Sequence, residues 1–146
     1  TGSSKYGILF RNTSNGLIYN NTISTIGSSS LGVYVHNNSN NNVIDFNMMT
    51  GGGIQTFLLV TNTNISNNII AATGTVITLI NNSGKVFNNR LTTSSSSSYG
   101  IYSPGYNNLT NNTIIINSSS SYSTSSGIYV NGLFNNIINN TINVTN

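Results

Sequence analysis

The chain has 146 residues and a mass of 15.5 kDa, a length that predicts one domain over residues 1–146. Only 3% of the residues are charged, and the net charge of +3 comes from the scattered Lys5, Arg11, Lys85 and Arg90 against a single acid, Asp45. Because the cations are dispersed, a nucleic-acid partner is not expected. A hydrophobic content of 36% together with this low charge argues against disorder. No apolar run approaches the roughly 18 residues of a membrane-spanning helix.

The elements predicted in chain order are short strands separated by polar turns. Residues 7–10 form the first strand, residues 12–16 a turn rich in Asn, Thr, Ser and Gly, and residues 17–19 a second strand. An Asn pair follows, then a third short strand at Ile23, a loop over residues 24–31 and a new strand from Gly32. The same order recurs through strands at residues 57–60, 76–79, 100–102 and 127–130.

Six copies of one short pattern explain this recurrence. Each copy centres on an Asn, with an aliphatic residue three positions earlier and an apolar residue two positions later. The central residues are Asn21, Asn47, Asn68, Asn89, Asn112 and Asn140. Successive copies lie 26, 21, 21, 23 and 28 residues apart, which is typical of solenoids and other repeat architectures. A leucine-rich repeat would need more Leu and a helical repeat better helix formers, so an all-β coil of about six turns is predicted.

These residues resemble the right-handed parallel β-helix repeat of the pectin-lyase-like superfamily. In that repeat, Gly-Ile and polar turn residues precede an aliphatic residue, two spacers, an Asn, one spacer and another aliphatic residue. The resemblance covers nearly the whole chain and implies a single-stranded, right-handed parallel β-helix. The composition, rich in Asn, Ser and Thr and poor in charge, is similar to that of adhesin-like surface proteins of archaea.

The six central Asn residues are predicted to face inward as a structural ladder. Neighbouring turns of a parallel coil lie about 4.8 Å apart, and an amide side chain both donates and accepts hydrogen bonds, so stacked Asn residues can bond continuously along the axis. Asn also tolerates the left-handed backbone conformation that a sharp turn between strands needs. The residues just before them are expected to form an outer row: Asn20, Asn67, Asn88, Asn111 and Asn139.

No catalytic, cofactor-binding or metal site is predicted. Glycoside hydrolysis ordinarily uses two carboxyl groups, whereas this chain has only Asp45, which is expected to point outward. The one histidine, His36, is expected to be a turn residue. A Ser–His–Asp catalytic triad could be written from His36, Asp45 and any of many Ser residues, but without a nucleophile-elbow motif such a match carries no information. A polysaccharide lyase or hydrolase is therefore the least favoured function, and no cofactor is expected.

Two kinds of surface feature suggest contact with carbohydrate. Tyr34, Tyr102 and Tyr129 follow inward Ile or Val residues and could form an exposed aromatic row that packs on sugars, although outward Tyr is also ordinary on a β-surface. Asn37 and Asn117 are candidate N-glycosylation sites in loops. The ten sequons of the chain are close in number to the roughly eight that its composition gives by chance (30 × 41/146).

The favoured function is a non-catalytic, extracellular or cell-surface structural protein, an adhesin stalk or a filament subunit. Joining Asn146 to Thr1 would continue the repeat, which suggests either flanking repeats of a longer chain or end-to-end self-association. The chain without an initial Met is expected to be a processed form or a fragment. The alternative is a carbohydrate-binding or tail-fibre-like, receptor-binding β-helix, with glycans as partners.

Overall fold

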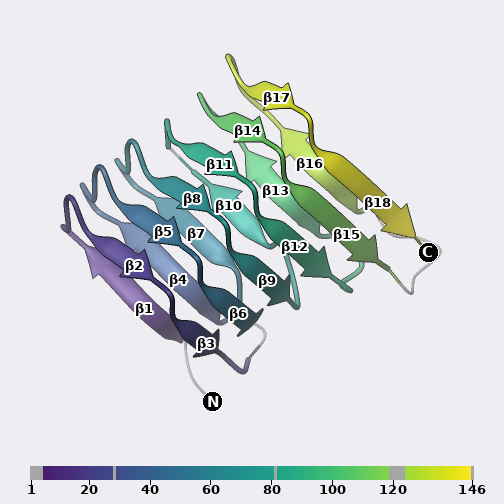
Figure 1. Ribbon diagram of the computed structural model, residues 1–146, viewed down its shortest axis with the longest axis horizontal. Helices are drawn as coiled ribbons and strands as arrows, with labels where there is room; N and C mark the ends of the chain where they lie inside the picture. The colour runs from purple at the N-terminus through teal and green to yellow at the C-terminus, as the bar shows by residue number, and fades with distance from the viewer. Residues whose placement is uncertain (1–4, 28, 81, 119–123, 146) are drawn as a thin grey trace.

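The computed structural model describes residues 5–27, 29–80, 82–118 and 124–145. Within these ranges the chain forms eighteen β-strands and no helix. The strands gather into three parallel sheets of six strands each, wound as one coil (Figure 1). The chain is therefore an all-β parallel solenoid, as the repeat pattern predicts.

Each turn of the coil contributes one strand to each sheet. Sheet A contains β1 (Tyr6–Arg11), β4 (Leu31–His36), β7 (Ile54–Phe57), β10 (Ile77–Leu79), β13 (Tyr99–Ser103) and β16 (Ser126–Val130). Sheet B contains β2 (Leu17–Tyr19), β5 (Val43–Asp45), β8 (Asn64–Ser66), β11 (Lys85–Phe87), β14 (Asn108–Thr110) and β17 (Asn136–Ile138). Sheet C contains β3 (Thr22–Ser24), β6 (Met48–Gly51), β9 (Ile69–Ala72), β12 (Arg90–Thr93), β15 (Thr113–Asn117) and β18 (Thr141–Thr145).

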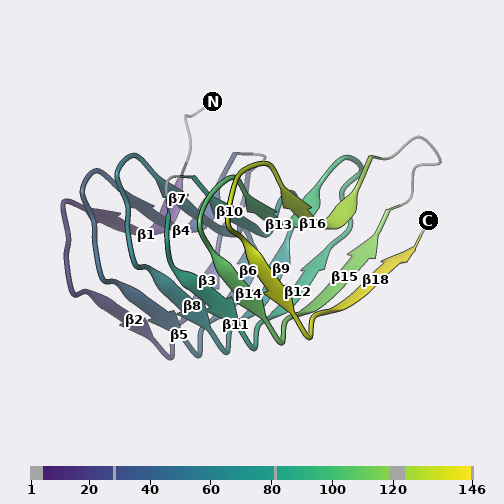
Figure 2. The ribbon, with the colours of Figure 1, turned by 90° about the horizontal axis from the view of Figure 1, so that it is seen from above.

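The number of turns differs slightly from the prediction. Six strands in a sheet are separated by five steps, so the coil completes about five turns between its first and last strands. The view from above shows the turns stacked side by side along one axis (Figure 2). The right-handed sense stays a prediction from the resemblance, and the predicted join between Asn146 and Thr1 lies outside the described residues.

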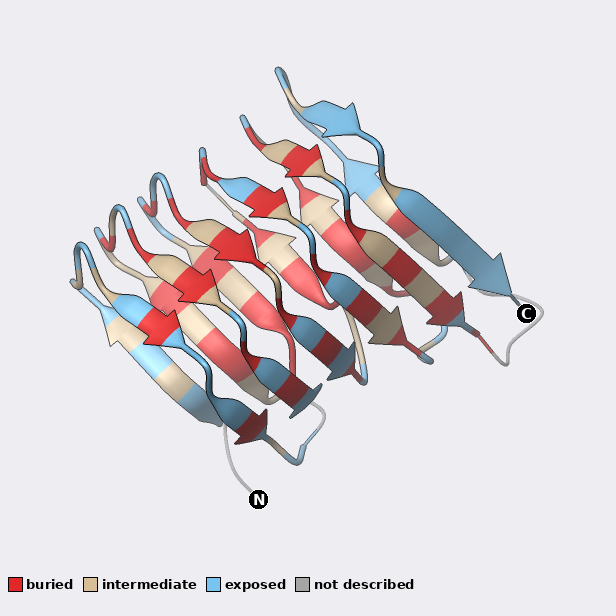
Figure 3. Ribbon diagram, viewed as in Figure 1, coloured by how far each residue is buried: buried red, intermediate tan, exposed pale blue. Residues whose placement is uncertain are grey.

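The core is a set of aliphatic rows that run along the axis, one for each inward position. The pairing of sheet B places Ile18, Ile44, Ile65, Val86 and Leu109 above one another, each at most 2% exposed. Sheet C adds a matching row of Ile23, Met49, Ile70, Leu91 and Ile114. Residues on either side of these positions point outward, because side chains alternate along a strand. Burial accordingly appears as bands that cross the strands (Figure 3).

The predicted Asn ladder is present between sheets B and C. The Nδ2 of each central Asn donates to the Oδ1 of the Asn in the next turn, at 2.9–3.0 Å, in five consecutive hydrogen bonds from Asn21 to Asn140. The backbone N–H of each donor residue also donates to that same Oδ1, at 2.9–3.1 Å. The four middle members, Asn47, Asn68, Asn89 and Asn112, are at most 2% exposed, so the ladder satisfies polar groups inside the core.

The left-handed backbone lies one residue before the position that the sequence predicts. The positive φ angles of 52–57° belong to the outer row, Asn20, Asn67, Asn88, Asn111 and Asn139, and in the second turn to Phe46. The ladder residues themselves have no positive φ. The outer residue therefore makes the sharp turn, and this leaves the next side chain free to point inward and bond along the axis.

Candidate functional site

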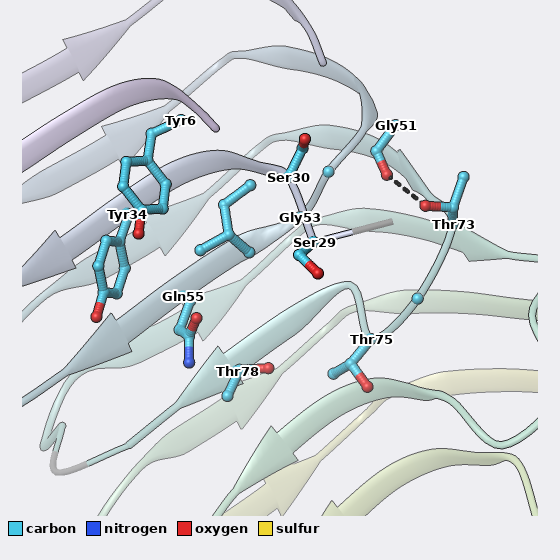
Figure 4. A pocket seen from close by; sticks show the side chains of 13 residues that line it. Tyr6, Ser29, Ser30, Tyr34, Gly51, Gly53, Gln55, Thr73, Thr75 and Thr78 are labelled. Carbon is cyan, nitrogen blue, oxygen red and sulfur yellow. Dashed lines mark hydrogen bonds between the residues drawn. The ribbon is translucent and has the colours of Figure 1, made fainter. Parts of the chain in front are cut away.

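A cleft of about 430 Å³ lies over the outer face of sheet A. Its floor includes Tyr34 on β4, Gln55 on β7 and Thr78 on β10, which are aligned by the strand register. One wall carries Tyr6, and hydroxyl groups of the linkers between sheets C and A complete the lining (Figure 4). The cleft is therefore an open polar groove with an aromatic wall, and it crosses neighbouring turns of the coil.

Differences in linker length produce the cleft. Only Gly52 and Gly53 join β6 to β7, and residues 73–76 join β9 to β10, whereas residues 25–30 and 94–98 form longer linkers in the flanking turns. A Cβ atom on Gly53 would collide with the carbonyl oxygen of Val76, so the backbones of the two short linkers lie in direct contact. Thr73 Oγ1 also donates to the carbonyl oxygen of Gly51 at 3.1 Å. The two short linkers thus leave a gap between the longer linkers of the flanking turns, and this gap is the cleft.

The chemistry of the lining suits a neutral, hydroxyl-rich ligand. All thirteen lining residues are uncharged, and Ser29, Ser30, Thr73, Thr75 and Thr78 bring hydroxyl groups that both donate and accept. Burial, and to a lesser extent the nearby Tyr6, raises the pKa of Tyr34 above its ordinary value of 10.0. The phenol of Tyr34 therefore stays protonated at neutral pH and can donate a hydrogen bond.

Tyr34 belongs to a stack of three rings, which limits how it could touch a sugar. Its ring centroid lies 4.9 Å from that of Tyr6, with the planes tilted by 31°, and 4.6 Å from that of His36, with the planes nearly parallel at 11°. His36 follows Tyr34 by two residues on β4, while Tyr6 pairs with Leu31 at the start of that strand. Both rings therefore contact Tyr34 and reduce the part of its ring that a ligand could reach. The exposed ring of this stack is Tyr6, at 39%.

The predicted aromatic row is interrupted. Tyr34, Tyr102 and Tyr129 do occupy one outward position of sheet A, but Gln55 and Thr78 occupy the same position in the two turns between Tyr34 and Tyr102. A second ring group lies at the far end, where Tyr99, Tyr102 and Tyr129 have centroids 4.9–5.8 Å apart and planes within 26° of one another. Two aromatic groups therefore lie at opposite ends of one outer face, with a polar gap between them.

Neither residue that sequence reasoning weighed for catalysis lies in the cleft. The carboxylate of Asp45, on sheet B, accepts hydrogen bonds from Ser66 Oγ at 2.7 Å and from Asn67 Nδ2 at 2.8 Å. His36 is the last residue of β4, not a turn residue, and its ring packs on Tyr34. In the described part of the chain, no three acidic or histidine side chains gather where a metal ion could bind. No helix of the described residues is long and apolar enough to span a membrane.

The two candidate glycosylation residues differ in their surroundings. Asn117 is exposed at the end of β15, where its Oδ1 accepts a hydrogen bond from Thr145 Oγ1 at 3.0 Å. Asn37 is half-buried in the turn after β4, with a φ of 54°. Glycosylation of either residue stays a prediction.

Sequence reasoning missed a second row of buried Asn residues, between sheets A and B. Asn42, Asn82 and Asn107 are at most 2% exposed, and each accepts a hydrogen bond from a backbone N–H of the preceding turn. Asn135 continues the row by accepting from the N–H of Asn107 at 3.3 Å. A signal was present, because Asn42, Asn107 and Asn135 each stand five residues before a ladder Asn. This signal was weak because the residue five positions before the ladder Asn is Thr63 or Gly84, not Asn, in the two turns between.

No protein-family model matches the chain. The comparisons with curated proteins and with solved structures also gave no significant match. The parallel solenoid therefore rests on the strand arrangement itself, and membership of the pectin-lyase-like superfamily stays a prediction.

Proposed function

We propose that this chain is a non-catalytic, extracellular or cell-surface β-helix that serves as an adhesin stalk or a filament subunit. The observation that carries this proposal is the continuous ladder from Asn21 to Asn140, which bonds every turn to the next in the same way. Three in-register sheets add parallel backbone hydrogen bonds along the same axis. This regular bonding along one axis is the feature that supports a stalk or fibre, because each turn is joined to the next in the same way.

A non-catalytic role is consistent with the chemistry of the chain. The single carboxylate, Asp45, is engaged by Ser66 and Asn67 on sheet B. Acid–base cleavage of a glycosidic bond ordinarily needs a second carboxyl group, and the sequence has none. Any turnover of a polysaccharide that disappears in an Asp45→Asn variant would contradict this part of the proposal.

Electron microscopy of the native material at high dilution, with antibody labelling of intact cells, tests the structural role. Straight rods or fibres and a label on the outer surface are the expected results. Long fibres would identify a filament subunit, whereas isolated rods would favour a stalk. Flexible or compact particles, or a label confined to the cell interior, would overturn the proposal.

The cleft favours a second function, the binding of a neutral carbohydrate. Its lining combines the exposed ring of Tyr6 with hydroxyl groups and the Gln55 amide, and binding sites typically combine apolar surface with a few polar groups that fix orientation. Tyr102 and Tyr129 offer another aromatic surface three strand spacings beyond Tyr34, or about 14 Å away. An oligosaccharide that lies along the axis could contact both ends.

A glycan array followed by titration calorimetry tests this second function. We expect neutral oligosaccharides to bind more tightly than uronate-containing ones, because the lining carries no cation. Tyr6→Ala and Tyr102→Ala should each weaken binding. Tyr19→Ala is the matched control, since Tyr19 is 54% exposed but lies on sheet B, away from the cleft. Loss of binding in the control alone, or preference for acidic glycans, would contradict the assignment.

A further inference from the structure

The sequence contains two Asn-Gly pairs, Asn15-Gly16 and Asn131-Gly132, and the structure treats them differently. Asn-Gly is chemically labile because a glycine has no side chain to obstruct attack by its backbone nitrogen on the preceding Asn. Both Asn15 and Asn131 are exposed to solvent. Solvent exposure therefore does not distinguish the two pairs, and any difference in reactivity must come from how the backbone of each pair is held.

We infer that Asn131 is a site of spontaneous deamidation, and that the fold protects Asn15 from the same reaction. In this reaction the Gly132 nitrogen loses its proton and attacks Cγ of Asn131, and the new C–N bond closes a five-membered succinimide. The bond between Cγ and the side-chain nitrogen breaks, and that nitrogen takes up a proton and leaves as ammonia. Water then opens the ring at either carbonyl, which gives aspartate or isoaspartate. No oxidant, reductant or further reagent is needed.

The protection of Asn15 comes from the buried Asn42. The N–H of Gly16, which would have to act as the nucleophile, donates to Asn42 Oδ1 at 2.8 Å. The carbonyl oxygen of Gly16 accepts from the N–H of Val43 at 2.9 Å, so both backbone polar groups of Gly16 are hydrogen-bonded to the next turn. Asn42 is fully buried and is itself anchored, because its Nδ2 donates to the carbonyl oxygen of Thr13 at 2.9 Å.

Space is also restricted around Gly16. A Cβ atom placed on this glycine would lie 2.5 Å from the Phe10 ring and 2.9 Å from Asn42 Oδ1, so the peptide has little room to rotate toward the Asn15 side chain. The left-handed backbone of Asn15, with a φ of 59°, is further fixed because its N–H donates to the carbonyl oxygen of Asn40 at 2.9 Å. Hydrogen bonds and packing thus hold the Asn15-Gly16 peptide in one conformation.

In the described part of the chain, the Gly132 N–H lacks the hydrogen bond that holds the Gly16 N–H. Packing is close at both glycines, because a Cβ atom placed on Gly132 would collide with the carbonyl oxygen of Pro104, so the missing hydrogen bond is the difference between the two pairs. The N–H of Asn131 donates to the carbonyl oxygen of Ser103 at 3.3 Å, which ties the start of the pair. No described residue accepts a hydrogen bond from the N–H of Gly132, and Gly132 is exposed. The nucleophilic nitrogen is therefore available to attack. The product would place a carboxylate two residues after Tyr129, in a chain whose only other acid is Asp45.

Incubation of the folded chain at mildly alkaline pH, followed by peptide mapping with mass spectrometry, tests the inference. We expect conversion at Asn131 to be roughly two- to tenfold faster than at Asn15, the rate effect of one hydrogen bond that must first break. In concentrated denaturant the two pairs should react at similar rates. Equal rates in the folded protein, or a difference that persists in denaturant, would overturn the inference.

Two variants separate the roles of the residues. Asn42→Ser should raise the rate at Asn15 and leave the rate at Asn131 unchanged, because it removes the acceptor of the Gly16 N–H. If this variant does not fold, the wild-type comparison alone decides. Asn131→Gln should abolish the acidic species that ion-exchange chromatography resolves after incubation, since glutamine closes its ring far more slowly. An acidic species that forms in Asn131→Gln as fast as in the wild type would place the reaction elsewhere and contradict the assignment.

Discussion

At the scale of single residues, the ladder is a row of side chains whose neighbours depend on one another. Asn89 Nδ2 donates to Asn112 Oδ1 and to the carbonyl oxygen of Ile65, at 3.0 and 2.9 Å, and Asn89 Oδ1 accepts two donors from Asn68. Removal of this amide would leave buried groups without partners in both neighbouring turns. The ladder should therefore contribute most to stability where it is continuous, in the middle of the coil.

We predict that Asn89→Leu destabilises the fold by about 3 kcal/mol or more, since each buried polar group left unpaired costs roughly 1–3 kcal/mol. The midpoint of urea unfolding is the measurement. Asn88→Gly is the matched control, because Asn88 is exposed and left-handed, with a φ of 57°, and glycine adopts that conformation without strain. A control that loses as much stability as Asn89→Leu would show that the ladder is not the cause.

A second residue-scale prediction concerns Phe46, the one outer-row residue that is not Asn. Its φ of 54° is unfavourable for a bulky side chain, and its ring is 55% exposed. Left-handed backbone costs an ordinary residue roughly 1–2 kcal/mol, a cost that Asn largely avoids. Loss of the edge-to-face contact with Tyr19 removes about 0.5–1.5 kcal/mol. We therefore expect Phe46→Asn to stabilise the protein slightly.

Thermal unfolding of Phe46→Asn and Phe46→Ala distinguishes backbone strain from lost packing. Both variants lose the Tyr19 contact, but only Asn relieves the left-handed strain. The Asn variant should have the higher melting temperature of the two. An Ala variant that equals or exceeds it would mean that strain at this position is unimportant.

At the scale of elements, the linkers between sheets C and A decide where the cleft forms. Gly53 has no positive φ, so its need for glycine is purely steric: an added Cβ would meet the carbonyl oxygen of Val76. Gly74, in the next linker of the same cleft, has nothing within 4 Å of an added Cβ. Both glycines line the same cleft, but only Gly53 is packed so closely that a side chain would not fit.

We predict that Gly53→Ala destabilises the fold by about 1–3 kcal/mol, the usual cost of overpacking. Gly74→Ala should be neutral or stabilising by about 0.4–1 kcal/mol, because alanine restricts the unfolded chain at a site where it fits. Urea unfolding of the pair measures the difference. Equal effects would indicate that the two linkers are not in contact as described.

At the scale of the whole molecule, the features that recur in every turn could be predicted from the sequence, whereas the cleft, which does not recur from turn to turn, could not. The inward rows and the ladder follow from spacing, because each turn must bury the same positions. The strand predicted at residues 57–60 was wrong, because β7 ends at Phe57 and the left-handed Leu58 and Leu59 turn the chain there. The cleft depends on unequal linkers, which the uneven repeat spacing already indicates, and on the approach of Gly53 to Val76, which a single sequence does not reveal. The left-handed position was wrong by one residue, because an Asn pair offers two candidates and only the direction of the ladder side chain distinguishes them.

The inward rows are buried along the coil but become exposed in its last turn. Leu109 and Ile137 occupy the same inward position of sheet B in adjacent turns, yet Leu109 is fully buried and Ile137 is 47% exposed. Figure 3 shows the same contrast for the last strands of sheets B and C, β17 and β18, which are exposed along their whole length. Leu109→Ala should cost about 2–5 kcal/mol, as large-to-small changes in a core do, and Ile137→Ala clearly less.

Unfolding of both variants across a range of protein concentrations tests this. If Ile137→Ala becomes as costly as Leu109→Ala at high concentration, then another molecule covers the last turn, as the filament form of the proposed function requires. A small cost at every concentration would leave this face uncovered in solution and argue for a stalk.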